Sequence, residues 1–348
     1  MDRGLFLNLA RRGLRFPIAT DLTLHEHPDP EQARRDPATL GRIVALSAGR
    51  WQCPVAIPLM DLRLEKADLL SALGIPEEQA ESFHFTERPP AAVPRRLFLP
   101  AHAAAIGAIR WIRDHTTLIP CGMTIGPFSL LTRLLADPIT PLALLARGMQ
   151  EDEDVSIDIA LRARQLAIAT VTRSVRAQLE AGAQVVIVCE PSASIAYLSP
   201  RQQRAGATLF EHFVLAPNRA LRDQIHAAGA LLFFHNCGEL TNDMVAAFGQ
   251  DLHPEVLSLG SSRDLAADAG LVPEDTVLYG NLPTRRFYSD SALPASEVAA
   301  LTVSLVARMR AAGHAHITGS ECDVLHVAGA MKAIERKLSI LMNAEPGA

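Results

Sequence analysis

GALLFFHNCGEL (residues 229–240) is the stretch that decides the fold of this chain. After one glycine it runs through five apolar residues without polar alternation, and it then reaches His235, Asn236 and Cys237. A short, continuous apolar run is typical of a parallel strand that is buried on both faces. The segment therefore predicts a central strand whose carboxyl end presents polar side chains.

Seven further short apolar runs accompany the one at 230–235; they lie at residues 16–20, 54–59, 118–121, 184–189, 256–259, 277–280 and 315–318. Ala-rich stretches with helical periodicity separate them, for example residues 158–180 and 217–228. Strands that alternate with helices in this way, to the number of eight, are what a closed barrel requires. We therefore predict an α/β fold, a (β/α)₈ TIM barrel, with a short amphipathic helix as an N-terminal extension.

The length of the chain fits a single barrel domain over residues 1–348, since α/β barrels routinely exceed the size of an average domain. The stretch at 61–110 is longer than one crossover needs, and it contains Pro89, Pro90 and Pro94. We expect helices and an irregular excursion there, not a second domain.

Composition and charge exclude several classes of function. The net charge is −5 and the arginines are scattered, so a nucleic-acid partner is not expected. No stretch has the length and apolarity of a membrane span or a secretory signal. The five cysteines are odd in number and far apart, which favours reduced thiols in the cytoplasm. Of these, Cys53, Cys121 and Cys189 are expected to be small core residues.

Polar residues follow the ends of several predicted strands. His235 and Cys237 follow the fifth strand, and Cys322 follows the eighth. In a TIM barrel the carboxyl ends of all strands converge on one face, which carries the active site. Imidazole and thiolate are preferred zinc ligands, and three protein ligands with one exchangeable position are typical of catalytic zinc. The alternative interpretation is a core histidine beside inert buried cysteines.

Four more polar residues at strand ends are candidates for the same face. Glu190, after the fourth strand, is predicted to be catalytic, as a general acid or base, a zinc ligand or a hydrogen-bond partner of His235. A carboxylate that caps the next helix is the alternative. Asp21 and Asp61 are expected to bind substrate, with a hydrogen bond to loop backbone as the alternative, and not to be metal ligands. Asn281 is expected to bind substrate too, unless it is only a turn asparagine.

Five motifs give the chain a resemblance to a known family: GPFSLLTRLL (126–135), EPSASIAYLSP (190–200), FFHNCGEL (233–240), GNLPT (280–284) and TGSECDV (318–324). Together they resemble the uroporphyrinogen decarboxylase superfamily, in its zinc-dependent, corrinoid-linked methyltransferase branch. The resemblance implies zinc held by His235, Cys237 and Cys322. It also implies a corrinoid (cobalamin) on a corrinoid-binding partner protein, and a small-molecule methyl donor or acceptor, either a thiol or a methoxylated compound.

Two departures from the family pattern qualify the resemblance. The decarboxylases proper carry an arginine-rich motif near the N-terminus, which residues 12–21 lack. Related zinc methyltransferases often have an acidic residue after the sixth strand, where this chain has Gly260. We therefore expect water, a buffer molecule or Glu190 at the fourth zinc position. A metal-independent decarboxylase and a non-catalytic corrinoid-binding protein remain the alternative functions.

Overall fold

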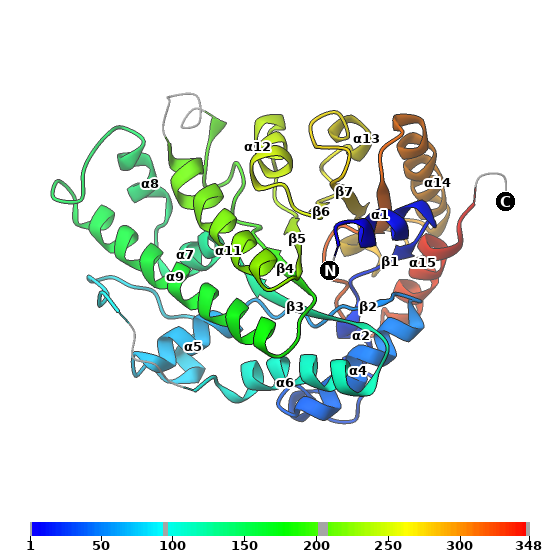
Figure 1. Cartoon of the computed structure of the whole chain (residues 1–348), viewed down its shortest axis with the longest axis horizontal. Coiled ribbons are helices and arrows are strands. Elements are labelled where there is room, and N and C mark those ends of the chain that lie inside the picture. Colours follow the sequence, from blue (N-terminus) through cyan, green and yellow to red (C-terminus); the bar gives the residue numbers. More distant parts are fainter. Residues whose placement is uncertain (1, 93–96, 201–207, 346–348) are drawn as a thin grey trace.

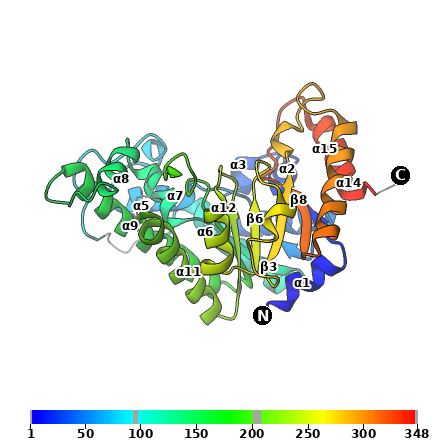
Figure 2. The same cartoon turned by 90° about the horizontal axis from the view of Figure 1, so that it is seen from above.

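The computed structural model describes residues 2–92, 97–200 and 208–345. Eight parallel strands form one sheet in the order β1-β8-β7-β6-β5-β4-β3-β2. They are β1 (Arg15–Phe16), β2 (Val55–Ala56), β3 (Ile119–Ile125), β4 (Val185–Cys189), β5 (Leu231–Asn236), β6 (Val256–Leu259), β7 (Val277–Leu282) and β8 (His316–Ser320). The sheet curls around a common core with the helices outside it (Figures 1 and 2), which confirms the predicted fold class.

Helices fill the connections between the strands. The longer ones are α1 (Gly4–Arg11), α4 (Pro37–Arg50), α5 (Leu64–Ala72), α6 (Pro100–His115), α7 (Pro127–Leu134), α9 (Val155–Glu180), α11 (Ala216–Ala227), α14 (Ala295–Ala312) and α15 (Met331–Asn343). The shorter ones are α2 (Thr20–Leu24), α3 (Pro30–Ala33), α8 (Ile139–Leu145), α12 (Asn242–Ala247) and α13 (Leu265–Asp268), with single turns η1 (Glu77–Gln79), η2 (Phe210–Leu215), η3 (Phe248–Leu252) and η4 (Thr284–Arg286). No helix of the described residues has the length and apolarity to cross a membrane.

The first two strands are shorter than the sequence predicts. The run at 16–20 contributes only Phe16 to β1, and Thr20 already belongs to α2. Pro17 interrupts this strand because proline has no N–H to donate to the sheet. The hydroxyl of Thr20 donates to the carbonyl of Ile57 at 2.6 Å, which joins the segments that follow β1 and β2.

The expected N-terminal helix and the long connection before β3 are both present. α1 precedes β1, as predicted. Residues 61–110 contain α5, η1 and the start of α6, with irregular chain between them. Pro89 and Pro90 lie in this irregular part, whereas Pro94 lies outside the described residues.

Alternate residues of the strands face two different layers. On β4, Val185, Ile187 and Cys189 belong to the cluster inside the barrel, which also contains Phe16 from β1 and Phe233 from β5. The residues between them, such as Val186 and Val188, pack against the surrounding helices. Because side chains alternate along a strand, the residue two positions after Phe233 also points to the interior. That residue is His235.

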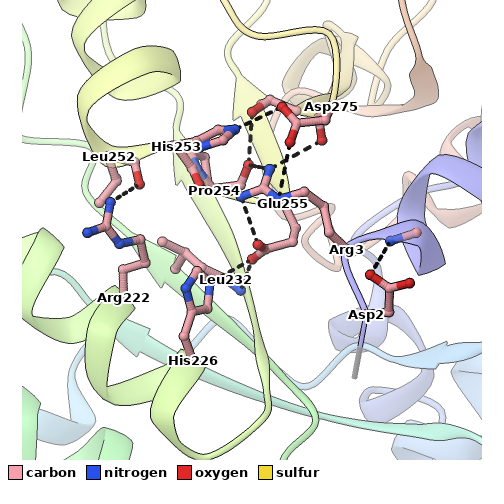
Figure 3. A network of polar contacts seen from close by, with 12 residues as sticks. Asp2, Arg3, Arg222, His226, Leu232, Leu252, His253, Pro254, Glu255 and Asp275 are labelled. Carbon is pink, nitrogen blue, oxygen red and sulfur yellow. Dashed lines mark hydrogen bonds and ion pairs between the residues drawn. The ribbon is translucent and has the colours of Figure 1, made fainter.

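The amino end of the barrel is held together by Arg3, the residue directly before α1 (Figure 3). Arg3 pairs with Glu255 at 2.9 Å and donates to the carbonyl oxygens of His253, Pro254 and Asp275. Glu255 is 3% exposed and also accepts the N–H of Leu232 at 2.7 Å. These contacts tie α1 to the starts of β5, β6 and β7.

Candidate metal centre

Three side chains from the carboxyl ends of β5 and β8 meet at one point. His235 is the fifth residue of β5, Cys237 follows that strand directly, and Cys322 comes two residues after β8. The ligand atoms of the three lie within 4.8 Å of one another. His235 is buried, whereas the two cysteines are half-buried. Cys322 is more than 80 positions away from the other two residues along the chain, yet the three side chains could together hold a metal ion.

The histidine is oriented as a metal ligand needs to be. Its Nδ1 lies 2.8 Å from the hydroxyl oxygen of Ser258 on β6. Its Nε2 is buried and has no hydrogen-bond partner among the described residues. An unpaired buried polar atom costs free energy, on the order of 1–3 kcal/mol. A metal ion at Nε2 would remove that cost, so the residues present fit the group that the sequence predicts.

The two cysteines share one hydrogen-bond system. The contact with Cys237, together with the neighbouring His235 and Arg285, lowers the pKa of Cys322. The same contact with Cys322, together with burial, raises the pKa of Cys237. The pair therefore holds one proton more readily than two. Because thiolate is the form that binds metals, the pair is already partly prepared to do so.

A cavity of about 530 Å³ opens beside Cys322. Its walls are mostly apolar, with Leu59, Met60, Leu62, Tyr288, Val324, Leu325, Val327 and Ile334. Thr284 and ionisable side chains complete the lining; the ionisable ones are Asp21, Asp61, Asp323, Arg34, Arg63, Arg133 and Arg285. Sites for small molecules usually combine apolar walls with a few polar groups that fix orientation. The cavity is large enough for such a molecule to approach the metal group.

Both aspartates that the sequence predicts at this face line the cavity. Asp21 accepts a hydrogen bond from Arg34 at 3.2 Å and from the backbone N–H of His326 at 2.8 Å. Asp61 is paired with Arg63 at 2.8 Å, and hydrogen bonds from this arginine lower the pKa of Asp61 against the opposing effect of burial. Both carboxylates therefore contribute negative charge to a cavity wall already rich in arginine.

Glu190 does not join this group. It is 0% exposed, and it accepts hydrogen bonds from the backbone N–H groups of Phe128 and Ser129 at 2.9 and 2.8 Å. The hydroxyl of Ser129 and the amide of Asn218 donate to it as well. Because the preceding residue, Cys189, faces the barrel interior, Glu190 faces outward, to the first turn of α7. The geometry corrects the expectation that this carboxylate reaches the mouth, and it matches the alternative of a helix cap.

Asn281 is also used by the protein itself. Its side-chain amide donates to the carbonyl oxygens of Gly260 and Arg263 at 2.9 and 2.8 Å, and so fixes the loop after β6. The side chain does not line the cavity. The structure thus gives Asn281 the turn role that was the alternative to substrate binding.

Gly260 has a steric reason to be a glycine. A Cβ atom at this position would lie 2.8 Å from the carbonyl oxygen of Cys237, a distance that real Cβ atoms essentially never show. The loop after β6 therefore passes directly against the backbone of Cys237. A carboxylate cannot occupy this position unless one of the two segments moves.

Several residues of the site could not be recognised from the sequence. Ser258 is one ordinary residue within an apolar strand, yet it holds His235. Arg285 follows GNLPT after β7, and its Nη2 lies 3.2 Å from the sulfur of Cys237. Met60 places its sulfur 3.9 Å from that of Cys322. The position of Arg285 after a barrel strand was the only available signal.

Comparison with known proteins agrees with this description. The family model described as uroporphyrinogen decarboxylase (URO-D) matches residues 77–331. A solved structure described as a methyltransferase from Methanosarcina mazei has a TM-score of 0.63 at 13% sequence identity, covering 94% of this chain and 92% of that one. At this identity the likeness concerns the fold. Comparison with curated protein sequences finds no match. The family model spans well over half of the chain and includes His235, Cys237 and Cys322, so the chain belongs to the uroporphyrinogen decarboxylase family.

Proposed function

We propose that this protein is a zinc-dependent methyltransferase that moves a methyl group between a corrinoid, carried by a partner protein, and a thiol or methoxylated substrate. One observation carries the proposal: an imidazole and two thiols lie within 4.8 Å of one another beside a cavity of about 530 Å³. This donor set suits zinc, and it leaves room for one exchangeable ligand. The shared fold with a methanogen methyltransferase supports the same reading.

The chain's own residues prepare the site. When Nδ1 of His235 donates to Ser258, its Nε2 lone pair is free to bind a metal. Cys237 and Cys322 would hold the ion as thiolates. A bound zinc ion would supply Lewis acidity, which lowers the pKa of a thiol that binds to it. The corrinoid would carry the methyl group.

The cavity next to Cys322 would bind and orient the small substrate. Its apolar walls would contact the apolar part of a substrate, and Asp21 and Asp61 with their arginines offer donors and acceptors. Tyr288 and Leu325 are 50% and 57% exposed at this cavity and provide an apolar rim over which a partner protein can dock. The five free cysteines fit a reducing compartment, for which we propose the cytoplasm.

Metal analysis tests the proposal first. Protein purified without chelator is expected to contain about one zinc per chain. Cys322→Ala should lose most of it, whereas the matched control Cys121→Ala, at a buried cysteine of the barrel interior, should retain it. Full retention of zinc by Cys322→Ala would show that the ligand set is wrong.

The activity is tested with methylcobalamin and a panel of thiols, followed by the change in cobalamin absorbance. We expect demethylation of the corrinoid that requires zinc and a thiol. Zinc-replete protein that is inert with every thiol and methoxylated compound would contradict the methyltransferase assignment.

A metal-independent decarboxylase of the same family is the second candidate. Four arginines, Arg34, Arg63, Arg133 and Arg285, line the cavity and could bind the carboxylates of a substrate. Two of them, Arg34 and Arg63, are already paired with Asp21 and Asp61, which weakens this interpretation. Release of carbon dioxide from a carboxylated substrate by zinc-free protein would favour the decarboxylase.

A further inference from the structure

Arg285 differs from the other paired arginines of the cavity in the group that it contacts. It lies in η4, directly after β7, and its Nη2 is 3.2 Å from the sulfur of Cys237. Arg34 and Arg63 instead pair with the carboxylates of Asp21 and Asp61. Among the described residues, no carboxylate oxygen lies within 4.0 Å of the Arg285 guanidinium. Its positive charge is therefore directed at a metal-site sulfur.

A buried carboxylate holds Arg285 in place through its backbone. Glu321 is 7% exposed, and its Oε1 accepts the backbone N–H of Arg285 at 3.2 Å. Its Oε2 accepts the hydroxyl of Ser261, after β6, at 2.5 Å. Glu321 is also the residue before Cys322. One carboxylate thus joins the ends of β6, β7 and β8, and fixes Arg285 relative to the metal group.

The inference rests on the proposed function, and it starts from a chemical problem of that function. A site with Cys237, Cys322 and a thiol substrate offers three sulfur atoms to a methyl donor. Methylation of a ligand cysteine would form a carbon–sulfur bond, turn the thiolate into a neutral thioether and destroy the ligand. The enzyme therefore needs its own sulfur atoms to be poorer nucleophiles than the substrate's.

A hydrogen bond donated to sulfur draws electron density from the lone pair that would attack the methyl group. Such a bond is stronger when the donor is a guanidinium. The positive charge of Arg285 also lowers the reactivity of this sulfur. A divalent ion with two thiolates is neutral, so a third anion from the substrate would leave a net negative charge, which Arg285 offsets.

We propose that Arg285 is a positioning residue that protects Cys237 from methylation, so that the methyl group goes to the substrate thiol. The protection comes from the hydrogen bond to Cys237, and Glu321 maintains it. The prediction concerns the reactivity of one cysteine, and it can be measured without corrinoid or partner protein.

The experiment uses the zinc-loaded full chain and methyl iodide as the methyl donor. Attack by the Cys237 thiolate breaks the carbon–iodine bond, forms the carbon–sulfur bond and releases iodide. Peptide mass spectrometry follows the methyl adduct on Cys237, and metal analysis follows zinc. We expect Cys237 to be methylated about tenfold faster in Arg285→Leu, the factor that loss of one charged hydrogen bond implies. Arg285→Lys, which keeps the charge, should restore much of the protection.

Arg63→Leu is the matched control, because it removes another cavity arginine that contacts Asp61 and not the sulfur. It should leave the rate at Cys237 unchanged. Equal rates in the wild type and Arg285→Leu, both with full zinc, would overturn the inference alone. Loss of zinc by Arg285→Leu would assign Arg285 to metal affinity instead, and would also overturn it. Absence of zinc from the wild type would contradict the proposed function, and the inference with it.

Discussion

The two ends of the barrel differ in how far Arg3 and Glu255 at one end, and His235 and Arg285 at the other, are paired with other groups of the protein. At the amino end, Arg3 contacts the Glu255 carboxylate and three backbone carbonyls, and Glu255 is satisfied in turn (Figure 3). At the carboxyl end, Nε2 of His235 is buried and has no partner within residues 2–92, 97–200 and 208–345, and Arg285 donates a hydrogen bond to the sulfur of Cys237. Polar groups that satisfy one another stabilise a fold, whereas groups left open can bind a ligand.

Unsatisfied polar groups are a better sign of a functional site in this fold than buried charge is. Buried charge is present at both ends, so burial of a charged residue does not by itself mark a site. The distinguishing feature is a group of donors and acceptors that the protein does not satisfy, next to a cavity that a small molecule can enter. Glu190 is the opposite case. It is buried and charged, but both of its carboxylate oxygens accept hydrogen bonds from the protein, which indicates a structural role.

The largest effect is expected at the amino end. Glu255→Ala leaves Arg3 and the N–H of Leu232 without their buried acceptor. We expect the free energy of unfolding to fall by about 3–5 kcal/mol, with zinc content per folded chain unchanged. Urea denaturation measures the first and metal analysis the second. Asp275→Asn, at a carboxylate that is 44% exposed, is the control and should cost less than about 1 kcal/mol. Loss of zinc by the folded Glu255→Ala protein would break the division between the two ends.

The next prediction concerns Glu190, on which sequence and structure disagree. Glu190→Gln places an amide donor against the N–H groups of Phe128 and Ser129. We expect a loss of about 1–3 kcal/mol in the free energy of unfolding, and retention of zinc. Chemical denaturation and metal analysis of the same preparation distinguish the two readings. A stable variant that has lost its metal would restore Glu190 as a ligand.

At the carboxyl end, Ser258→Ala tests whether Ser258 orients His235 for metal binding. It removes the partner of His235 Nδ1 while leaving all three ligands in place. We expect zinc affinity to fall by about 10–100-fold, as is typical when a group that orients a ligand is lost. Competition with a chelator measures the affinity. Ser320 is another fully buried strand serine, and its hydroxyl oxygen accepts the backbone N–H of Ile18, so the control Ser320→Ala should leave the affinity unchanged.

The smallest effect is a pH dependence from the start of β8. Burial, together with the positive charge of Arg15, lowers the pKa of His316 from 6.5 to about 4. The unfolded chain therefore takes up a proton between these values that the folded chain does not, so stability is complete above pH 6.5 and falls as pH decreases toward 4. At about pH 5.5 the loss should be about 1 kcal/mol. Thermal melts of the wild type and His316→Gln check this. The melting temperature of the wild type should fall relative to that of His316→Gln as pH decreases from 6.5 toward 4, whereas the difference should be constant above pH 6.5. Curves that stay parallel across this range would contradict the assignment.

The amino-acid sequence alone was enough to predict the class of fold and the candidate metal-binding group. Continuous apolar runs that alternate with helical stretches favour a parallel sheet covered by helices, because strands buried on both faces need helices around them. The count of eight such runs favours a barrel over an open sheet. Once the barrel is fixed, all strand ends meet on one face, so His235, Cys237 and Cys322 could be placed together from their positions alone. Asp21 and Asp61 reach the same cavity for that reason.

The sequence does not show which strand-end residues face the mouth of the barrel and which are already hydrogen-bonded within the protein; the packed three-dimensional structure does. Glu190 and Cys189 are neighbours in sequence, but they lie on opposite faces because side chains alternate along a strand, and a shift of one residue reverses their roles. Asn281 is held by two carbonyl groups, and Gly260 is required by the backbone of Cys237. Ser258 and Arg285 become part of the site only through contacts between different strands, which depend on the three-dimensional register of β5, β6 and β7 and not on any local pattern of residues.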